Sequence, residues 1–297
     1  MRNNRNMDKG VLTNVDMKRG KYKFLYWLIF AVLLIWGVGI CLLPVIWVML
    51  SGFKSPQEMY AIPASFLPKS LDLSKIIRVW NEMKFYRYYL STMIMACGAV
   101  VFTIIICGLA GYVLSKLKPR GSKIVFAIFF WLMLVPSTMR TVPLYMTFKE
   151  FPLLHINMLN SYFPIWLMSA ADIFSIILFK NFFDGISMQI VEAARVDGAS
   201  NTRIFFAIIL PLSLPVFWTV AIFTFNGQFG QFFWPFLLIS DKEKTVIGVQ
   251  LYKMKKSTFT MDYQMLALFF SMIPQLLIFA LFQRQLIGGV NVGGVKG

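Results

Sequence analysis

Long apolar runs without a charged side chain constrain the fold of this sequence more than any other feature. Such runs cover residues 24–53, 88–115, 204–240 and 263–283. Two further apolar stretches, residues 124–148 and 151–179, each contain a single charged residue. A helix needs about 20 apolar residues to cross a bilayer, whereas the strands of a membrane barrel are shorter and alternate in polarity. The runs therefore predict an all-α integral membrane protein with six transmembrane helices.

The composition supports this class and excludes others. Of the 297 residues, 58% are hydrophobic and 14% are charged, which is too apolar for a soluble surface. The formal charge of +16 comes largely from short loops, as membrane topology requires, so it indicates no nucleic-acid partner. His155 is the only histidine, and the three cysteines lie within apolar runs as small packing residues. We therefore predict no metal site, no cofactor and no catalytic centre.

Basic residues predict which ends of the spans face the cytoplasm. Residues 1–23 and the turn at residues 116–123 are rich in Lys and Arg. Cytoplasmic loops carry such an excess, so we expect a multi-pass membrane protein with both termini in the cytoplasm. The predicted parts are a cytoplasmic segment at 1–23, a first span with an outer linker at 24–87, a core at 88–287, within which 241–262 form another outer loop, and a cytoplasmic tail at 288–297.

A polar break at residues 192–215, with the sequence EAARVDGASNTRIFFAIILPLSLP, separates two apolar runs. Its first alanines favour a helix, and Gly198 can end that helix. Asn201 and Thr202 are suitable N-caps for a second helix, whose interior is then disturbed by Pro211. The break therefore predicts a short helix, a turn and a second helix on the membrane surface, where a soluble partner can bind.

The spacing within this break carries a family resemblance. Glu-Ala-Ala is followed after three residues by Gly, after nine more by Ile, and after one more by Leu-Pro. This pattern resembles the coupling loop, or EAA loop, of the membrane subunits of ABC importers, which would cover residues 185–211. In that family the loop docks into a cleft of the ATP-hydrolysing subunit and carries its motion to the membrane helices. The resemblance assigns this coupling role to Glu192, Ala193, Ala194, Asp197, Gly198, Ile208, Leu210 and Pro211.

Three other segments resemble carbohydrate permeases in particular. They are the linker after the first span, the stretch VPSTMRTVPLYMTF and the Gly-rich C-terminal sequence FQRQLIGGVNVGGVKG. The chain thus resembles the permease subunit of a bacterial carbohydrate ABC importer of the maltose type, which implies the type I ABC importer permease fold. One stretch departs from this pattern, because Phe229-Gly230-Gln231 stands where maltose-type permeases often carry a Trp-Asn-Asp core.

The resemblance also implies partners. A second related permease subunit would complete the path, a dimer of cytoplasmic ATP-binding subunits would drive it, and an extracellular solute-binding protein would deliver a sugar or oligosaccharide. Membrane lipid would surround the spans. The chain has no Gly-rich phosphate-binding loop ending in Lys-Ser/Thr, so ATP hydrolysis is expected in the partner and not in this chain.

Five residues are candidates for the substrate path. Asp172 lies within an apolar run, where a carboxylate normally faces the protein interior or a water-filled cavity. It is expected either to be a structural partner for Arg140 or for a helix of another subunit, or to line the substrate path and accept hydrogen bonds from sugar hydroxyls. Arg140 itself either extends to the lipid headgroups or lines the path. Gln228, Gln231 and Trp234 either bond to a sugar and stack on it or anchor the chain at the membrane interface.

Other functions remain open on the residues alone. An ABC importer for a polyamine, an amino acid or an anion would share the coupling loop. A stand-alone secondary transporter would need internal repeats and coupling-ion groups. A membrane enzyme would need a cluster of catalytic groups. Neither the identity of the sugar nor the permease subunit that contacts it follows from the sequence.

Overall fold

The computed structural model describes residues 20–291, apart from residues 64, 83, 153–154 and 256–258. This part of the chain consists of helices and their connections. It contains no strand, and its single isolated β-bridge joins Phe151 to Ile156. The all-α prediction is therefore confirmed. The predicted N-terminal segment at 1–23 lies almost entirely outside the described residues.

Three helices are continuous and apolar over a length that crosses a bilayer. They are α1 (Gly20–Phe53), α4 (Phe85–Tyr112) and α15 (Met261–Asn291). At 1.5 Å per residue, even α4 is about 40 Å long, which exceeds the hydrocarbon thickness of about 30 Å. Helix α4 continues into a π-helical segment, Val113–Leu117.

The other three predicted spans are bent pairs of shorter helices. They are α5 (Ser122–Leu134) with α6 (Thr141–Lys149), α7 (Phe163–Ala170) with α8 (Ile173–Asp184), and the segment Asn201–Leu212 with α12 (Leu214–Phe229). The angles within the pairs are 99°, 41° and 79°. The six predicted spans are recovered when each pair counts as one span. Pro136 and Pro215 lie at two of the breaks, where their rings disfavour a continuous helix.

Helical structure extends into two segments that were predicted to lie outside the spans. Residues 241–262, predicted as an outer loop, contain the helix α14 (Ile247–Lys255). Ile247, Leu251 and Met254 follow helical spacing and pack into one apolar cluster with α4 and α15, so tertiary burial stabilises this short helix. Helix α15 continues to Asn291, so its last residues lie within the tail predicted from residue 288. Residues 292–297 lie outside the described residues.

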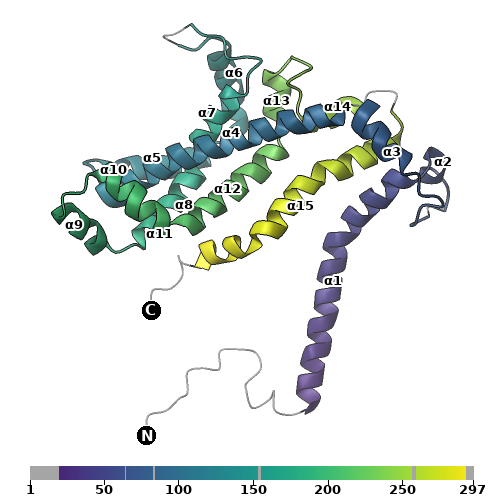
Figure 1. Cartoon of the computed structure of the whole chain (residues 1–297), viewed down its shortest axis with the longest axis horizontal. Coiled ribbons are helices and arrows are strands. Elements are labelled where there is room, and N and C mark those ends of the chain that lie inside the picture. Colours follow the sequence, from purple (N-terminus) through teal and green to yellow (C-terminus); the bar gives the residue numbers. More distant parts are fainter. Residues whose placement is uncertain (1–19, 64, 83, 153–154, 256–258, 292–297) are drawn as a thin grey trace.

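Helix α4 is the centre of the packing and contacts α7, α8 and α12 (Figure 1). Close approach to α8 depends on Gly111, because a Cβ atom there would lie 2.6 Å from Cβ of Phe179. Small residues at helix contacts are typical of membrane proteins. Helix α1 packs against α15 near its C-terminal end only, and its remaining length projects from the bundle with apolar side chains exposed.

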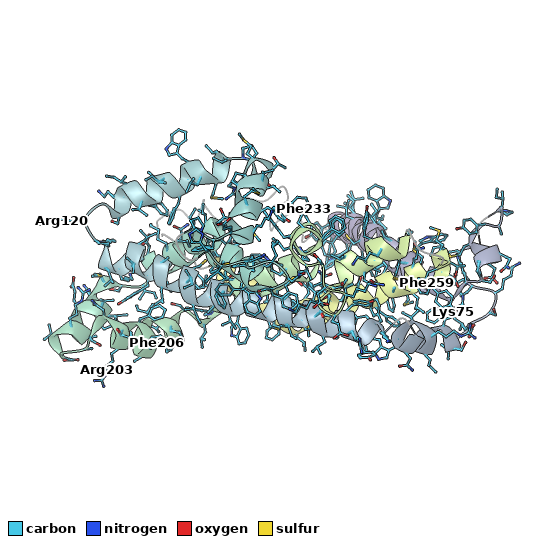
Figure 2. All side chains as sticks on the ribbon, turned by 90° about the horizontal axis from the view of Figure 1, so that it is seen from above. Lys75, Arg120, Arg203, Phe206, Phe233 and Phe259 are labelled. Carbon is cyan, nitrogen blue, oxygen red and sulfur yellow. The ribbon has the colours of Figure 1, made fainter. Side chains whose placement is uncertain are left out.

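The two ends of the bundle carry different segments. The helix α9 (Met188–Val196) lies at one end, and α14 lies with α3 (Ser74–Ile77) at the other. Seen from a perpendicular direction, Arg120 and Arg203 lie at the end of α9, and Lys75 and Phe259 lie at the opposite end (Figure 2). The predicted coupling loop and the predicted outer loops are thus separated by the full length of the helices.

Candidate functional site

The predicted coupling loop folds as a short helix, a turn and a second helix. Helix α9 begins after Ser187, whose hydroxyl accepts a hydrogen bond from the backbone N–H of Gln189 at 3.3 Å. It ends before Gly198, which has a φ of +80°. A positive φ favours glycine, so the prediction that Gly198 ends this helix is confirmed. The predicted N-caps were wrong, since Ser200 caps α10 (Asn201–Ile204).

The two faces of α9 have different environments. Val191 and Ala194 are buried in the same apolar cluster as side chains of α4, α8 and α12. Glu192 and Ala193 are exposed, and Val196 is 88% exposed. The three-residue spacing of the buried side chains matches one helical face. Of the two alanines in the motif, Ala194 is therefore packed inside the chain and Ala193 lies on the free surface.

The remaining motif residues lie on both sides of the turn. Asp197 is the C-cap of α9 and is exposed. Gly198 is also exposed, and a Cβ atom added to it would have no neighbouring atom within 4 Å. Ile208 and Leu210 are partly buried against the apolar cluster, whereas Pro211 is exposed. Glu192 lies beyond the first turn of α9, so its carboxylate is poorly placed to stabilise its own helix N-terminus. The surface that remains free for a partner is therefore the side of α9 with Glu192.

Two adjoining cavities, both open to the surface of the chain, lie beside the break between α7 and α8 and have volumes of about 330 and 970 Å³. Asp172 and Trp234 line both cavities. Gln228 and Gln231 line the smaller cavity, and Arg140 lines the larger. All five predicted path residues are thus brought to one connected region, although they come from three separate segments of the chain.

Asp172 is held by the break between α7 and α8. It is the N-cap of α8, and its Oδ2 accepts a hydrogen bond from the backbone N–H of Ser175 at 3.0 Å and another from the Ser175 hydroxyl. Its Oδ1 makes no hydrogen bond to any residue that the structure describes. None of the ion pairs in the described part of the chain joins Asp172 to Arg140. The expectation of a structural Arg140–Asp172 pair is therefore not met within this chain.

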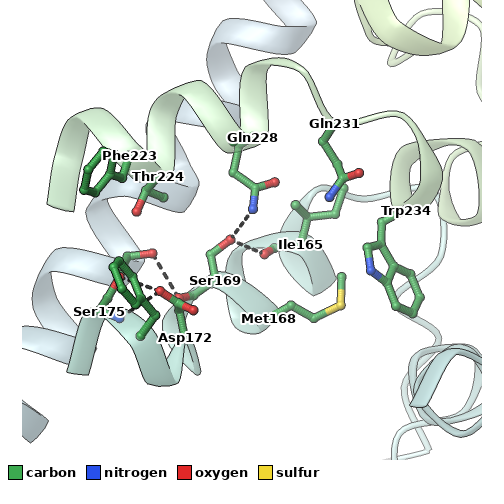
Figure 3. Close-up of a pocket in the computed structure, with 13 residues that line it drawn as sticks. Ile165, Met168, Ser169, Asp172, Ser175, Phe223, Thr224, Gln228, Gln231 and Trp234 are labelled. Carbon is green, nitrogen blue, oxygen red and sulfur yellow. Dashed lines mark hydrogen bonds between the residues drawn. The ribbon is translucent and has the colours of Figure 1, made fainter. Parts of the chain in front are cut away.

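The side chains of Gln228 and Ser169, which both line the smaller cavity, point toward each other and are in direct contact (Figure 3). The Gln228 amide donates to the Ser169 hydroxyl at 2.9 Å, and that hydroxyl donates to the carbonyl oxygen of Ile165 at 2.9 Å. The side-chain amide oxygen of Gln228, Oε1, is buried and has no hydrogen-bond partner among the described residues. A buried acceptor without a partner costs free energy, so a hydrogen bond donated to this atom by water or a ligand would be favourable once the atom is reached.

Sequence reasoning missed four hydroxyl side chains that line the smaller cavity: Thr103, Ser169, Ser175 and Thr224. Their only signal was a small polar side chain inside an apolar run, which is common in membrane helices for packing reasons. With Asp172, the two glutamines and Trp234, they give the cavity hydrogen-bonding groups beside apolar and aromatic surface. Such a lining suits a polar, uncharged solute with many hydroxyls.

Apolar helices long enough to span a membrane, cavities with hydrogen-bonding groups beside apolar surface, and an exposed helix at one end are consistent with a transport permease. Residues 101–291 match the family described as binding-protein-dependent transport system inner membrane component, and the chain belongs to this family. It is therefore a transport subunit rather than an enzyme. Family membership also implies an ATPase, a solute-binding protein and a second permease as partners.

Individual relatives extend this comparison. The diacetylchitobiose uptake system permease protein NgcG of Streptomyces coelicolor is 29% identical over 269 residues, which cover 89% of this chain and 86% of that protein. The sn-glycerol-3-phosphate transport system permease protein UgpE of Escherichia coli is 28% identical over 267 residues, covering 87% and 93%. The crystal structure of a bacterial ABC transporter involved in the import of the acidic polysaccharide alginate contains a chain that superimposes with a TM-score of 0.76 at 25% identity. The superposition covers 90% of this chain and 98% of that chain.

Proposed function

We propose that this chain forms half of the translocation path of an ATP-driven importer for a sugar or oligosaccharide. The observation that carries the proposal is the convergence of Asp172, Gln228, Gln231, Trp234 and Arg140 on two adjoining cavities. The hydroxyl, amide and indole groups there match the hydrogen-bonding and stacking surfaces of a saccharide. The diacetylchitobiose and alginate systems among the relatives support the same class of cargo.

Each path residue has a role in this proposal. The free Oδ1 of Asp172 and the side-chain amide oxygen of Gln228 accept hydrogen bonds from sugar hydroxyls. Trp234, which packs edge to face against Phe148, offers the rest of its indole to the solute. Arg140 follows the sharp bend between α5 and α6 and extends the polar lining into the larger cavity.

The exposed side of α9 is the proposed docking surface for one of two cytoplasmic ATP-binding subunits. The basic turn at residues 116–123 lies at the same end of the bundle, which supports a cytoplasmic position for that end. We propose a cytoplasmic position for both termini as well, because an excess of basic residues marks the cytoplasmic side of the membrane. The opposite end, with α3 and α14, then faces the solute-binding protein.

The test is to purify the tagged chain from its native membrane and identify by mass spectrometry what remains bound. We expect a second permease, an ATPase and a solute-binding protein, and we expect that binding protein to bind a saccharide in a ligand screen. The glycerol phosphate system among the relatives gives the competing cargo class. A binding protein that takes glycerol phosphates or another solute without sugar rings would overturn the cargo. Recovery of the chain alone would overturn the importer assignment.

A further inference from the structure

Both arms of the coupling loop contact the last turns of α4. The entering arm follows α8, which ends at Asp184, and the leaving arm is α10 with the π-helical segment Phe205–Ile209. Val191 and Ala194 of α9 are buried in the same cluster as Tyr112 of α4. The loop is therefore packed onto the end of α4 and is not a free appendage.

The entering arm is held by Lys116. This side chain is 5% exposed, and its Nζ donates a hydrogen bond to the carbonyl oxygen of Ile186 at 2.5 Å. Ile186 directly precedes Ser187, the N-cap of α9. Next to it, the Ser115 hydroxyl donates to Asp184 at 2.7 Å. A buried ammonium with few partners is costly, so its place beneath the start of α9 needs a specific explanation.

The leaving arm is held by Tyr112, one helical turn before Lys116. The ring of Tyr112 lies 5.1 Å from the ring of Phe205, and its hydroxyl donates to the carbonyl oxygen of Asn201 at 3.4 Å. Asn201 is the first residue of α10. Residues four apart lie on the same helical face, so one face of α4 contacts both arms.

The same helix reaches the polar cavity. The hydroxyl of Thr103, which lines the smaller cavity, donates to the carbonyl oxygen of Ser169 at 3.0 Å. Cys107 lies 3.2 Å from the carbonyl oxygen of Ala170, at the end of α7 before the break that positions Asp172. Thr103 and Lys116 are 13 residues apart, which corresponds to about 20 Å along a helix.

Two of the contacting segments are π-helical, namely Val113–Leu117 and Phe205–Ile209. Short π-helical segments within longer helices are rare and are frequent at functional sites. In both segments the unusual hydrogen bonding coincides with the contact between α4 and the coupling loop. Neither segment contains a proline that would explain it.

We infer that Lys116 and Tyr112 are positioning residues that make the coupling loop and α4 move together. Motion imposed on α9 is then delivered along α4 to Thr103 and to the break that holds Asp172. This inference rests on the proposed docking of residues 185–211 to an ATPase. It adds that the contact between the loop and α4, and not the docking alone, couples ATP hydrolysis to the cavity.

The test uses the complete importer in proteoliposomes, with solute uptake and ATP hydrolysis measured in parallel. Lys116→Met removes the hydrogen-bond donor and keeps most of the side-chain length. We expect it to lower solute uptake per ATP by about ten-fold, because a charge-assisted hydrogen bond is lost. Lys116→Arg keeps a donor and is expected to retain much of the coupling. Lys118→Met, at an exposed lysine two residues on, is the matched control and is expected to behave as wild type.

Two outcomes would overturn the inference. One is an unchanged ratio of uptake to ATP hydrolysis in Lys116→Met. The other is a parallel loss of both activities with less assembled complex in both Lys116→Met and Tyr112→Leu, which is the signature of a purely structural role. If Lys116→Met does not assemble, Tyr112→Leu carries the test with the same two readouts.

A Gly198→Asp variant separates this inference from the proposed docking of residues 185–211 to an ATPase. If it uncouples transport while Lys116→Met and Tyr112→Leu do not, only this inference fails. If it too transports normally, the proposed docking fails.

Discussion

Lys75 and Asp262, which are 187 residues apart in the chain, form an ion pair with 2.6 Å between Nζ and Oδ2. Lys75 is 7% exposed and Asp262 is 1% exposed. The same ammonium donates to the carbonyl oxygen of Lys54 at 2.6 Å. One buried side chain of the outer linker therefore joins the region after α1 to the first turn of α15.

Removing one partner of this pair should destabilise the protein strongly. Lys75→Met leaves the Asp262 carboxylate buried without a countercharge, so we expect the free energy of unfolding to fall by about 3–5 kcal/mol. Denaturation in detergent micelles, followed by tryptophan fluorescence, measures this change. The double replacement Lys75→Met with Asp262→Leu should recover much of the loss, because no buried charge then remains unpaired.

The control is the ion pair of Arg87 with Glu243, which is 3.0 Å long and has side-chain exposures of 46% and 77%. Arg87→Met should change the free energy of unfolding by less than about 1 kcal/mol, since exposed pairs are weak. Equal losses for Lys75→Met and Arg87→Met would contradict the distinction between the buried and exposed pairs.

Gly198 gives a prediction that separates coupling from stability. Gly198→Asp places a charged side chain on the free side of the loop and strains a residue with φ of +80°, at a backbone cost of about 1–2 kcal/mol. We expect the protein to insert and assemble, with solute uptake strongly reduced. Gly121→Asp is a matched control, because Gly121 has φ of +89° and also has no atom within 4 Å of a built Cβ. Equal effects of the two substitutions on uptake would show that backbone strain alone is responsible.

Glu192 tests the surface that the ATPase is proposed to contact. Its side chain is exposed on α9, so Glu192→Lys should leave the fold intact, with a stability change within about 0.5 kcal/mol. The reversed charge should reduce the amount of ATPase that co-purifies with the permease. Glu150→Lys changes an exposed carboxylate that pairs with His155 away from α9 and should not affect co-purification. Full retention of the ATPase by Glu192→Lys would argue against this docking surface.

Asp172 tests the substrate path. Asn also serves as an N-cap, so Asp172→Asn keeps α8 capped while it removes the charge in the cavity. Loss of a charge-assisted hydrogen bond to the solute should raise the apparent KM for uptake about ten-fold or more. Asp172→Ala should in addition lower the free energy of unfolding by about 1 kcal/mol through loss of the cap. An unchanged KM in Asp172→Asn would remove this residue from the substrate path.

The sequence by itself determined the membrane class, the number of apolar segments and the helix–turn–helix form of residues 185–211. These features depend on local patterns, namely the length of an apolar run and the conformational freedom of Gly198, which act within a few residues. The five candidate path residues could be named for the same reason, since a polar group in an apolar run stands out locally. The sequence alone predicted the number and type of these residues, but it did not predict how they are arranged in space.

Only the tertiary structure decided which of these segments meet. The break at Asp172, the burial of Ala194 against the core and the helix α14 depend on packing against segments far along the chain, as does the pair Lys75–Asp262. The free energy of such contacts comes from burial and from pairing between distant groups, which no local spacing records. That packing brings Arg140 and Asp172 to one cavity without forming an ion pair between them. It also places the Lys116 ammonium where it donates a hydrogen bond to the carbonyl oxygen of Ile186, just before α9.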